Sequence, residues 1–146
     1  RLIFLLNSAQ RKLQQWMTSQ QAWPTDANGG GSAPTSAQSG VLFALAKADG
    51  TTMGQLAEAL DLAPSAVSGL IQRMEALHWV QRRPCPRDAR TQRVWLLDPG
   101  RTQLPALKQA LKRVNARLHD GFSDEELHTV ARWLRHVQHL DDHPSP

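Results

Sequence analysis

The sequence lacks most of the features that mark an enzyme, a secreted protein or a membrane protein. It has one cysteine, Cys85, so no disulfide forms within the chain, which is typical of a protein from the reducing cytoplasm. It has no run of about eighteen apolar residues, the length that a membrane-spanning helix needs. Sequence motifs of serine hydrolases, zinc proteases, phosphate loops and dinucleotide-binding folds are missing as well. We therefore expect a cytoplasmic protein with no membrane contact, no catalytic activity, no cofactor and no bound metal.

The size and charge of the chain favour a small domain with a polyanionic partner. The 146 residues are enough for one domain with its own core. The formal net charge is +4 and the isoelectric point is about 10.0. A basic balance of this kind suits nucleic acid, although many basic proteins bind none. The placement of the positive charge along the chain is therefore the more informative feature.

Apolar residues recur at helical spacing in the first third of the chain. They predict a helix over residues 1–20, followed by a long loop where Gly, Pro, Ser and Asn dominate residues 23–36. Thr35 with Gln38 and Thr52 with Gln55 have the spacing of capping boxes, so each pair predicts the start of a helix. The first of these helices ends at Asp49-Gly50, and the second covers residues 53–60. Residues 51–52 form a short extended piece between them.

The central segment predicts two helices joined by a tight turn and followed by a β-hairpin. Residues 61–63 are the turn, and Pro64 opens a helix that reaches about His78. Strands are predicted over residues 79–83 and 92–97, with residues 84–90 as the tip. This order is that of a winged helix-turn-helix, whose second helix enters the DNA major groove. The inward stripe of that helix is predicted to be Val67, Leu70, Ile71, Met74 and Leu77.

The last third of the chain is predicted to be helical from residue 99 to about residue 140, with a break at Gly121. Ser123 and Glu126 form a third capping-box pattern there. We expect a mainly α fold with a small β-hairpin, a winged helix-turn-helix core flanked by N- and C-terminal dimerisation helices. Residues 1–146 form a single domain, with residues 34–98 as the DNA-binding lobe and residues 1–20 and 99–140 as dimerisation helices. An apolar seam that needs a partner surface consists of Leu104, Leu107, Leu111, Val114 and Leu118.

The outward face of the second helix carries small and hydrogen-bonding side chains. Small residues let a helix backbone sit deep in a groove roughly 12 Å wide. Serine hydroxyls suit phosphates or base edges, Gln72 suits adenine, and Arg73 suits guanine or a phosphate. The alternative is a plain helical hairpin whose small face serves close packing. The candidate residues on this face are Ser65, Ala66, Ser68, Gly69, Gln72 and Arg73.

The hairpin is rich in arginine, which favours DNA binding over a merely solvated hairpin. Arginine suits phosphate contacts and insertion into a narrow minor groove. Asp88 and Asp98 are the acids of this segment, and Asp88 is expected to hold Arg90 or a neighbouring backbone N–H in place. Arg83, Arg87, Asp88 and Arg90 are the candidate contacts of the wing. The basic residues of the segment are Arg82, Arg83, Arg87, Arg90, Arg93 and Arg101.

The central segment resembles the MarR family of bacterial transcriptional regulators. The resemblance rests on residues 55–104, QLAEALDLAPSAVSGLIQRMEALHWVQRRPCPRDARTQRVWLLDPGRTQL, and is strongest in the wing, RDARTQRVWLLDPGR. It implies a homodimer that binds double-stranded DNA at a pseudo-palindrome and represses transcription until a small effector releases it. Three positions depart from the family pattern: Ala63 replaces a helix cap, Gly69 replaces a basic residue, and residues 28–33 lengthen a loop.

Several further signals leave alternatives open. Trp16 and Trp23 are candidates for a pocket that takes a small aromatic or phenolic effector, although such residues more often serve packing. Cys85 has Arg83 and Arg87 nearby, which would activate a thiol, so a redox-triggered regulator is one alternative. The histidines near the C-terminus suggest a metal-triggered regulator as a second. A winged-helix protein-interaction or dimerisation module without DNA binding is the third.

Overall fold

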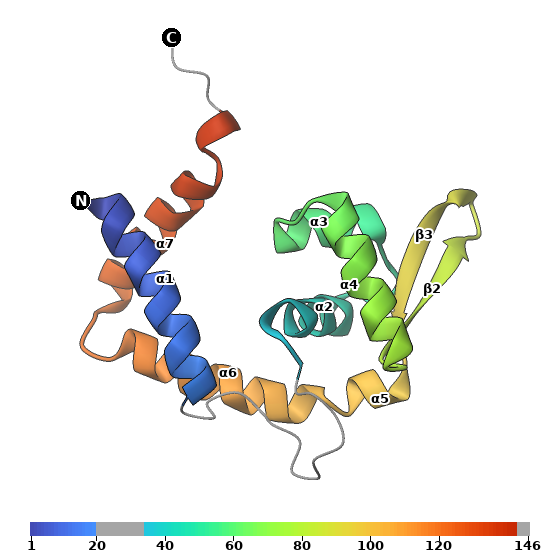
Figure 1. Ribbon diagram of the computed structural model, residues 1–146, viewed down its shortest axis with the longest axis horizontal. Coiled ribbons are helices and arrows are strands. Elements are labelled where there is room, and N and C mark those ends of the chain that lie inside the picture. Colours follow the sequence, from blue (N-terminus) through green and yellow to red (C-terminus); the bar gives the residue numbers. More distant parts are fainter. Residues whose placement is uncertain (20–33, 143–146) are drawn as a thin grey trace. The chain divides into compact units, whose positions relative to one another are not determined.

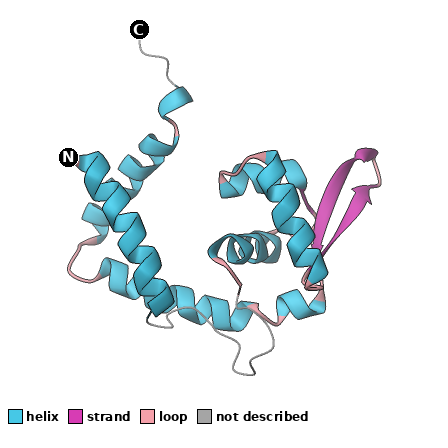
Figure 2. Ribbon diagram, viewed as in Figure 1, coloured by secondary structure: helices cyan, strands magenta, loops and turns pink. Residues whose placement is uncertain are grey.

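The computed structural model describes residues 1–19 and 34–142. The chain falls into two compact units, residues 1–111 and 112–146. Helices dominate both, and the first also holds a small antiparallel sheet (Figure 2). This confirms the predicted mainly α fold with a β-hairpin. Within the described residues, no helix is long and apolar enough to cross a membrane.

The first unit begins with α1 (Leu2–Ser19) and continues with α2 (Ser36–Lys47), as shown in Figure 1. The predicted capping box opens α2: the Thr35 hydroxyl accepts from the Gln38 N–H, and the Gln38 side chain accepts from the Thr35 N–H. The same reciprocal pair of bonds joins Thr52 and Gln55 at the start of α3 (Met53–Leu60). Local sequence therefore sets where both helices begin. The predicted loop over residues 23–36 lies largely outside the described residues.

The helix-turn-helix consists of α3 and α4 (Pro64–Ala76). Asp61 closes α3 in the left-handed conformation, with φ of 53°, and the Leu62 N–H donates to the Ala57 carbonyl. Pro64 takes the first position of α4, where its missing N–H costs nothing. Residues 61–63 are thus the short turn that the sequence predicts.

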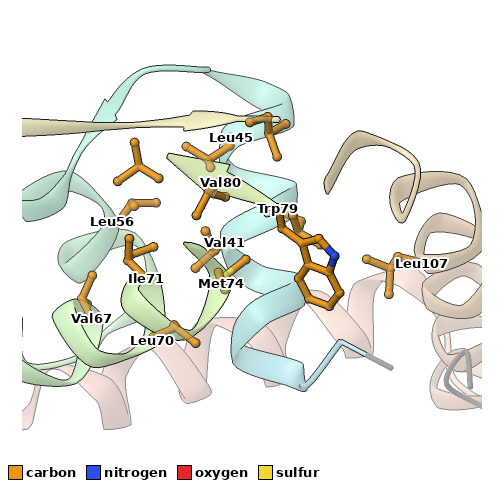
Figure 3. Packing of buried hydrophobic residues seen from close by; sticks show 13 residues of the cluster. Val41, Leu45, Leu56, Val67, Leu70, Ile71, Met74, Trp79, Val80 and Leu107 are labelled. Carbon is orange, nitrogen blue, oxygen red and sulfur yellow. The ribbon is translucent and has the colours of Figure 1, made fainter. Parts of the chain in front are cut away.

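The hydrophobic core of the first unit lies between α2, α3, α4 and the sheet (Figure 3). The predicted stripe of α4 is buried at Val67, Leu70, Ile71 and Met74. Leu77 is an exception, since it caps the helix and its side chain is 41% exposed. The prediction that Leu77 faces inward is therefore wrong, because the chain leaves the helix there. The other large buried members of the cluster are Val41, Leu42, Leu45, Leu56, Trp79, Val80, Val94, Leu96 and Leu107.

The wing is an antiparallel hairpin of β2 (Val80–Cys85) and β3 (Asp88–Leu96), and β1 (Thr51–Thr52) pairs with the other side of β3. One register runs from Val80 opposite Leu96 to Pro84 opposite Gln92. It then shifts, so that Cys85 pairs with Asp88 and residues 89–91 bulge from β3. The predicted loop over residues 84–90 is thus too long, since the strands reach the tip and leave only Pro86 and Arg87 as the turn.

The predicted helix from residue 99 is interrupted. A short helix α5 (Asp98–Arg101) precedes α6 (Leu104–His119), which extends into the second unit. Leu107 is buried in the core beside Trp79 (Figure 3), so part of the predicted dimer seam packs inside its own chain. Leu111 and Leu118 are exposed. The second unit ends with α7 (Asp124–Gln138), opened by the predicted Ser123–Glu126 capping box, and a 3-10 turn (Leu140–Asp142).

Candidate nucleic-acid interface

The structure brings the predicted recognition residues to one exposed face of α4. Ser65, Ala66, Ser68, Gln72 and Arg73 are exposed, and Gly69 is half-buried among them. Their apolar neighbours Val67, Leu70 and Ile71 point into the core. The division follows from helical spacing, because residues three and four apart share one face. This arrangement leaves a face of small side chains flanked by one amide and one guanidinium.

The two ends of α4 differ in how their backbone groups are satisfied. At the start, Ala63 offers no side-chain acceptor, as its sequence implies. At the end, His78 adopts the left-handed conformation with φ of 58°. The His78 N–H donates to the Glu75 carbonyl, and the Trp79 N–H donates to the Met74 carbonyl. These two bonds form a Schellman motif, which ends the helix firmly and turns the chain into β2.

The tip of the wing is organised by Asp88. Its Oδ1 accepts from the Arg90 N–H at 3.1 Å, and its Oδ2 lies 3.4 Å from the Thr91 hydroxyl. Both partners belong to the bulged residues 89–91. The expected role of Asp88 in holding a neighbouring backbone N–H is therefore confirmed. The carboxylate fixes the backbone that presents the Arg90 side chain.

The arginines of the wing fall into two groups. The first group stabilises the lobe: Arg82 forms an ion pair with Glu75 of α4 at 2.8 Å, Arg93 donates to the Gly50 carbonyl at 2.8 Å, and Arg101 pairs with Asp49 at 2.8 Å. These three side chains are occupied and are poor candidates for DNA contacts. None of them was among the predicted wing contacts.

The second group is exposed at the outer end of the hairpin. The Arg83 guanidinium donates twice to the Gln81 side-chain oxygen and lies 5.9 Å from the Trp95 ring centroid. Arg87 and Arg90 are exposed, and their side chains have no protein partner among residues 1–19 and 34–142. They are therefore free to meet an anion. All three belong to the set that sequence reasoning selected.

Cys85, the thiol considered above for a redox role, lies in β2 at the tip of the hairpin. Its side chain is buried, and the Arg93 Nε–H donates to its Sγ at 3.4 Å. This hydrogen bond, with the backbone N–H groups of Arg87 and Asp88, holds the pKa of the Cys85 thiol below its ordinary value. The side chain that lowers the pKa of the thiol is thus that of Arg93 and not that of Arg83, because the Arg93 Nε–H reaches the Sγ across the hairpin.

The predicted tryptophan pocket and the histidine metal site are not supported by contacts among the described residues. Trp16 is half-buried on α1, and Trp23 lies outside the described residues. Trp79 is in the core and Trp95 is half-buried on the sheet, as the packing interpretation expects. In the described part of the chain, no three His, Cys, Asp or Glu side chains gather as metal ligands. His139 instead pairs with Asp142 at 2.9 Å.

Sequence reasoning missed the residues that hold the interface in place. Glu75 accepts from both the backbone N–H and the Nε–H of Arg82, so it fastens the end of α4 to β2. Gln81 and Trp95 position Arg83, and Thr91 completes the tip. These contacts could not be found from the sequence alone. They depend on the strand register, which pairs Gln81 with Trp95 and Arg83 with Arg93.

The comparisons with known proteins agree with this geometry. Residues 34–91 match the sequence profile of the MarR family. No curated protein matches the chain. Among solved structures, the PcaV transcriptional regulator from Streptomyces coelicolor, in complex with its natural ligand, is similar at a TM-score of 0.74 and 21% identity, over 93% of this chain and 88% of that one.

Two further solved structures have the same fold. A probable transcriptional regulator from Pseudomonas aeruginosa has a TM-score of 0.73 at 22% identity, over 94% of this chain and 96% of that one. BpsR of Bordetella bronchiseptica, whose DNA binding is regulated by 6-hydroxynicotinic acid, has a TM-score of 0.68 at 22% identity, over 91% and 98%. Helix α4 and the wing therefore lie in a fold that these proteins share.

Proposed function

Because the winged-helix segment of this chain belongs to the MarR family and the chain has the fold of MarR-family transcriptional regulators, we propose that it is a sequence-specific DNA-binding repressor. Two copies bind a pseudo-palindromic operator in the cytoplasm, with α4 of each copy in a major groove. The wing tips carry Arg87 and Arg90 to the neighbouring backbone or minor groove. The observation that carries the proposal is the ordered tip, where Asp88 fixes the backbone at Arg90 and the Arg87 and Arg90 side chains have no partner among the described residues.

The residues of the interface have distinct roles in this proposal. Ser65, Ser68 and Gln72 face the base edges, Ala66 and Gly69 allow close approach, and Arg73 reaches a guanine or a phosphate. Arg83, stacked on Trp95, contacts the phosphate backbone near the wing. Phosphate contacts of this kind position a protein and carry most of the salt dependence, whereas base contacts decide the sequence.

A salt titration tests the DNA-binding proposal. Affinity for a random duplex, measured by fluorescence anisotropy, should fall linearly on a logarithmic scale as salt rises. Replacing Arg87 and Arg90 together by glutamine should reduce that slope by about two. The matched control replaces Arg113 and Arg117 of α6, which are exposed, and should leave the slope nearly unchanged. Absence of salt-dependent binding would refute the proposal. If the protein binds, enrichment of bound duplexes from a random-sequence pool identifies the operator.

We further propose that a small aromatic or phenolic molecule releases the DNA. The support comes from two similar structures, one described with its natural ligand and one regulated by 6-hydroxynicotinic acid. Trp16 of α1 is the described candidate for contacting such a molecule. Hydroxylated benzoic and nicotinic acids can be tested for dissociation of the protein–operator complex. A hit whose potency falls in Trp16→Ala but not in Trp133→Ala would support a pocket at α1.

A further inference from the structure

The carboxylate of Asp49 joins three elements of the DNA-binding lobe at one point. Asp49 follows the last turn of α2. Its Oδ1 accepts two hydrogen bonds, one from the Gly50 N–H and one from the Leu96 N–H at 2.9 Å. Leu96 is the last residue of β3, at the base of the wing. The other oxygen, Oδ2, accepts from Arg101 of α5 at 2.8 Å. One side chain thus connects α2, the wing and the helix that leads out of the lobe.

Backbone contacts around Asp49 hold the same junction. The Gly50 N–H donates to the Val94 carbonyl at 3.0 Å, and the Leu97 N–H donates to the Trp79 carbonyl at 3.0 Å. Gly100 packs so closely that a Cβ there would lie 2.3 Å from the Trp79 carbonyl oxygen. These contacts restrict the direction in which residues 97–101 leave the sheet. Besides these backbone contacts, the junction has an ion pair between the side chains of Asp49 and Arg101.

The ion pair is accessible and modest in strength. The Arg101 side chain is 52% exposed and the Asp49 side chain is 28% exposed. Pairs of this kind contribute little to the stability of a whole domain, because solvent screens them. A weak contact still restricts the angle at which α5 leaves the sheet, since the planar Arg101 guanidinium donates its hydrogen bond in a defined direction. The pair is thus suited to setting geometry and poorly suited to holding the fold together.

We propose that Asp49 and Arg101 are positioning residues that set the half-site spacing which the DNA-bound dimer accepts. The inference rests on the proposed function. In a dimer that binds two half-sites, the distance between recognition helices must match the helical repeat of DNA. α5 leads directly into α6, so the angle at which residues 97–101 leave the lobe decides where α4 points. Loosening the Asp49–Arg101 contact widens the range of that angle.

The test measures affinity against spacing for two variants and one control. The enriched palindrome is prepared with its half-sites at the preferred spacing and moved by one base pair either way, together with a duplex that holds one half-site. Asp49→Asn keeps an oxygen for the Leu96 N–H and loses the charge. Arg101→Gln removes the guanidinium and leaves the Leu96 bond intact. Lys47→Gln is the control, because Lys47 is exposed two residues from Asp49 and the variant loses one positive charge, as Arg101→Gln does.

The two variants should flatten the spacing profile. We expect binding at the preferred spacing to weaken about fivefold, in line with a partly exposed ion pair, and binding at shifted spacings to change less. Affinity for the single half-site should match the parent, as should the profile of Lys47→Gln. Combining Asp49→Asn with Arg101→Gln should add no further loss, because both remove the same contact.

Three outcomes are decisive. An unchanged spacing profile in both variants overturns the inference. An equal loss on the single half-site and on every palindrome also overturns it, because Asp49 would then act on the fold of the lobe, which thermal unfolding would reveal. A parent protein that binds neither duplex contradicts the proposed function itself, and the two failures are thereby separated.

Discussion

Cys85 is a residue whose chemistry depends on a neighbour eight positions away. Arg93 approaches its Sγ across the hairpin, and two backbone N–H groups at the tip add to the effect. All three favour the thiolate, so the pKa of the thiol is lowered in the folded protein. The thiol is also buried, which limits its reaction with solutes. Its titration is therefore a direct measure of how the tip is folded.

The first prediction concerns this titration. Replacing Arg93 by glutamine should raise the pKa of Cys85 toward its ordinary value, because the largest cause of the shift is removed. Since the folded pKa lies below the unfolded one, the thiolate adds stability as pH rises through that interval, and this gain is lost as pH falls through the folded pKa. Ultraviolet absorbance of the thiolate measures the pKa, and the absence of tyrosine removes the usual interference. Cys85→Ser should lack this pH dependence, and an unchanged pKa in Arg93→Gln would contradict the account.

The second prediction concerns His78, whose left-handed conformation is unusual for a residue with a side chain. Replacing it by glycine should stabilise the protein by about 0.5–1 kcal/mol, because glycine adopts φ of 58° without steric cost. Urea unfolding measures the free energy of unfolding. The control His136→Gly, inside α7, should instead destabilise by about 0.5 kcal/mol, because glycine has a lower helix propensity than histidine. A loss of stability in His78→Gly would mean that the imidazole makes a contact that matters more than the backbone.

At the scale of elements, the wing is the feature that the sequence described least completely. The arginine content and the acid at the tip predicted its character, because composition is visible without a fold. Which arginines have a partner within the lobe depends on residues such as Glu75, Gly50 and Asp49, which lie up to 52 residues away in the sequence. Helix starts were predicted well for the opposite reason. Capping boxes at Thr35, Thr52 and Ser123 involve side chains only three residues apart.

The third prediction separates the charge of Asp88 from its hydrogen bonds. Asp88→Asn keeps an acceptor for the Arg90 N–H and removes a negative charge near the DNA, so it should bind an operator at least as tightly as the parent. Asp88→Ala removes both and should bind about fivefold more weakly than Asp88→Asn, since a lost hydrogen bond costs about 1 kcal/mol. Anisotropy titrations compare the two. Equal affinities would show that the tip needs no acceptor at this position.

The fourth prediction concerns α5, which turns the chain out of the sheet. Gly100→Ala should destabilise the protein by about 1–3 kcal/mol, because the new Cβ would collide with the Trp79 backbone and the strand cannot move without disturbing the core. Gly54→Ala is the matched control. A Cβ there meets nothing within 4 Å, and alanine favours a helix, so this variant should be slightly more stable than the parent. Thermal or urea unfolding distinguishes them, and similar stabilities would refute the close approach.

At the scale of the molecule, apolar side chains remain exposed on both units. In α1, Leu2, Ile3 and Phe4 are each more than 60% exposed, and in α7 Val130 and Leu134 are 48% and 39% exposed. The predicted seam over residues 104–118 indicated one such surface, because spacing alone reveals an apolar face, and Leu111 and Leu118 of that seam are exposed. It did not reveal that Leu107 belongs to the core of its own chain, since a seam has the same spacing whichever surface covers it.

The fifth prediction tests whether a second copy covers these faces. Leu134→Glu should shift the protein from dimer to monomer in sedimentation equilibrium and weaken binding to a palindrome, because a buried carboxylate at an interface is costly. Arg132→Glu introduces the same acid on the opposite face of α7 and should leave the dimer intact. Spectra of both variants should retain the helical signal. A Leu134→Glu protein that stays dimeric would place the dimer interface elsewhere.

The bulge over residues 89–91 lets the wing vary in length without altering the rest of the lobe. The register from Val80 to Pro84 stays constant, and the surplus residues of β3 lie beyond it. A one-residue change within that register would turn Val94 and Leu96 away from the core. The same change beyond Gln92 would move no core side chain. We therefore expect insertions and deletions to be tolerated at the tip, where they would change the length of the wing and leave the core of the lobe unchanged.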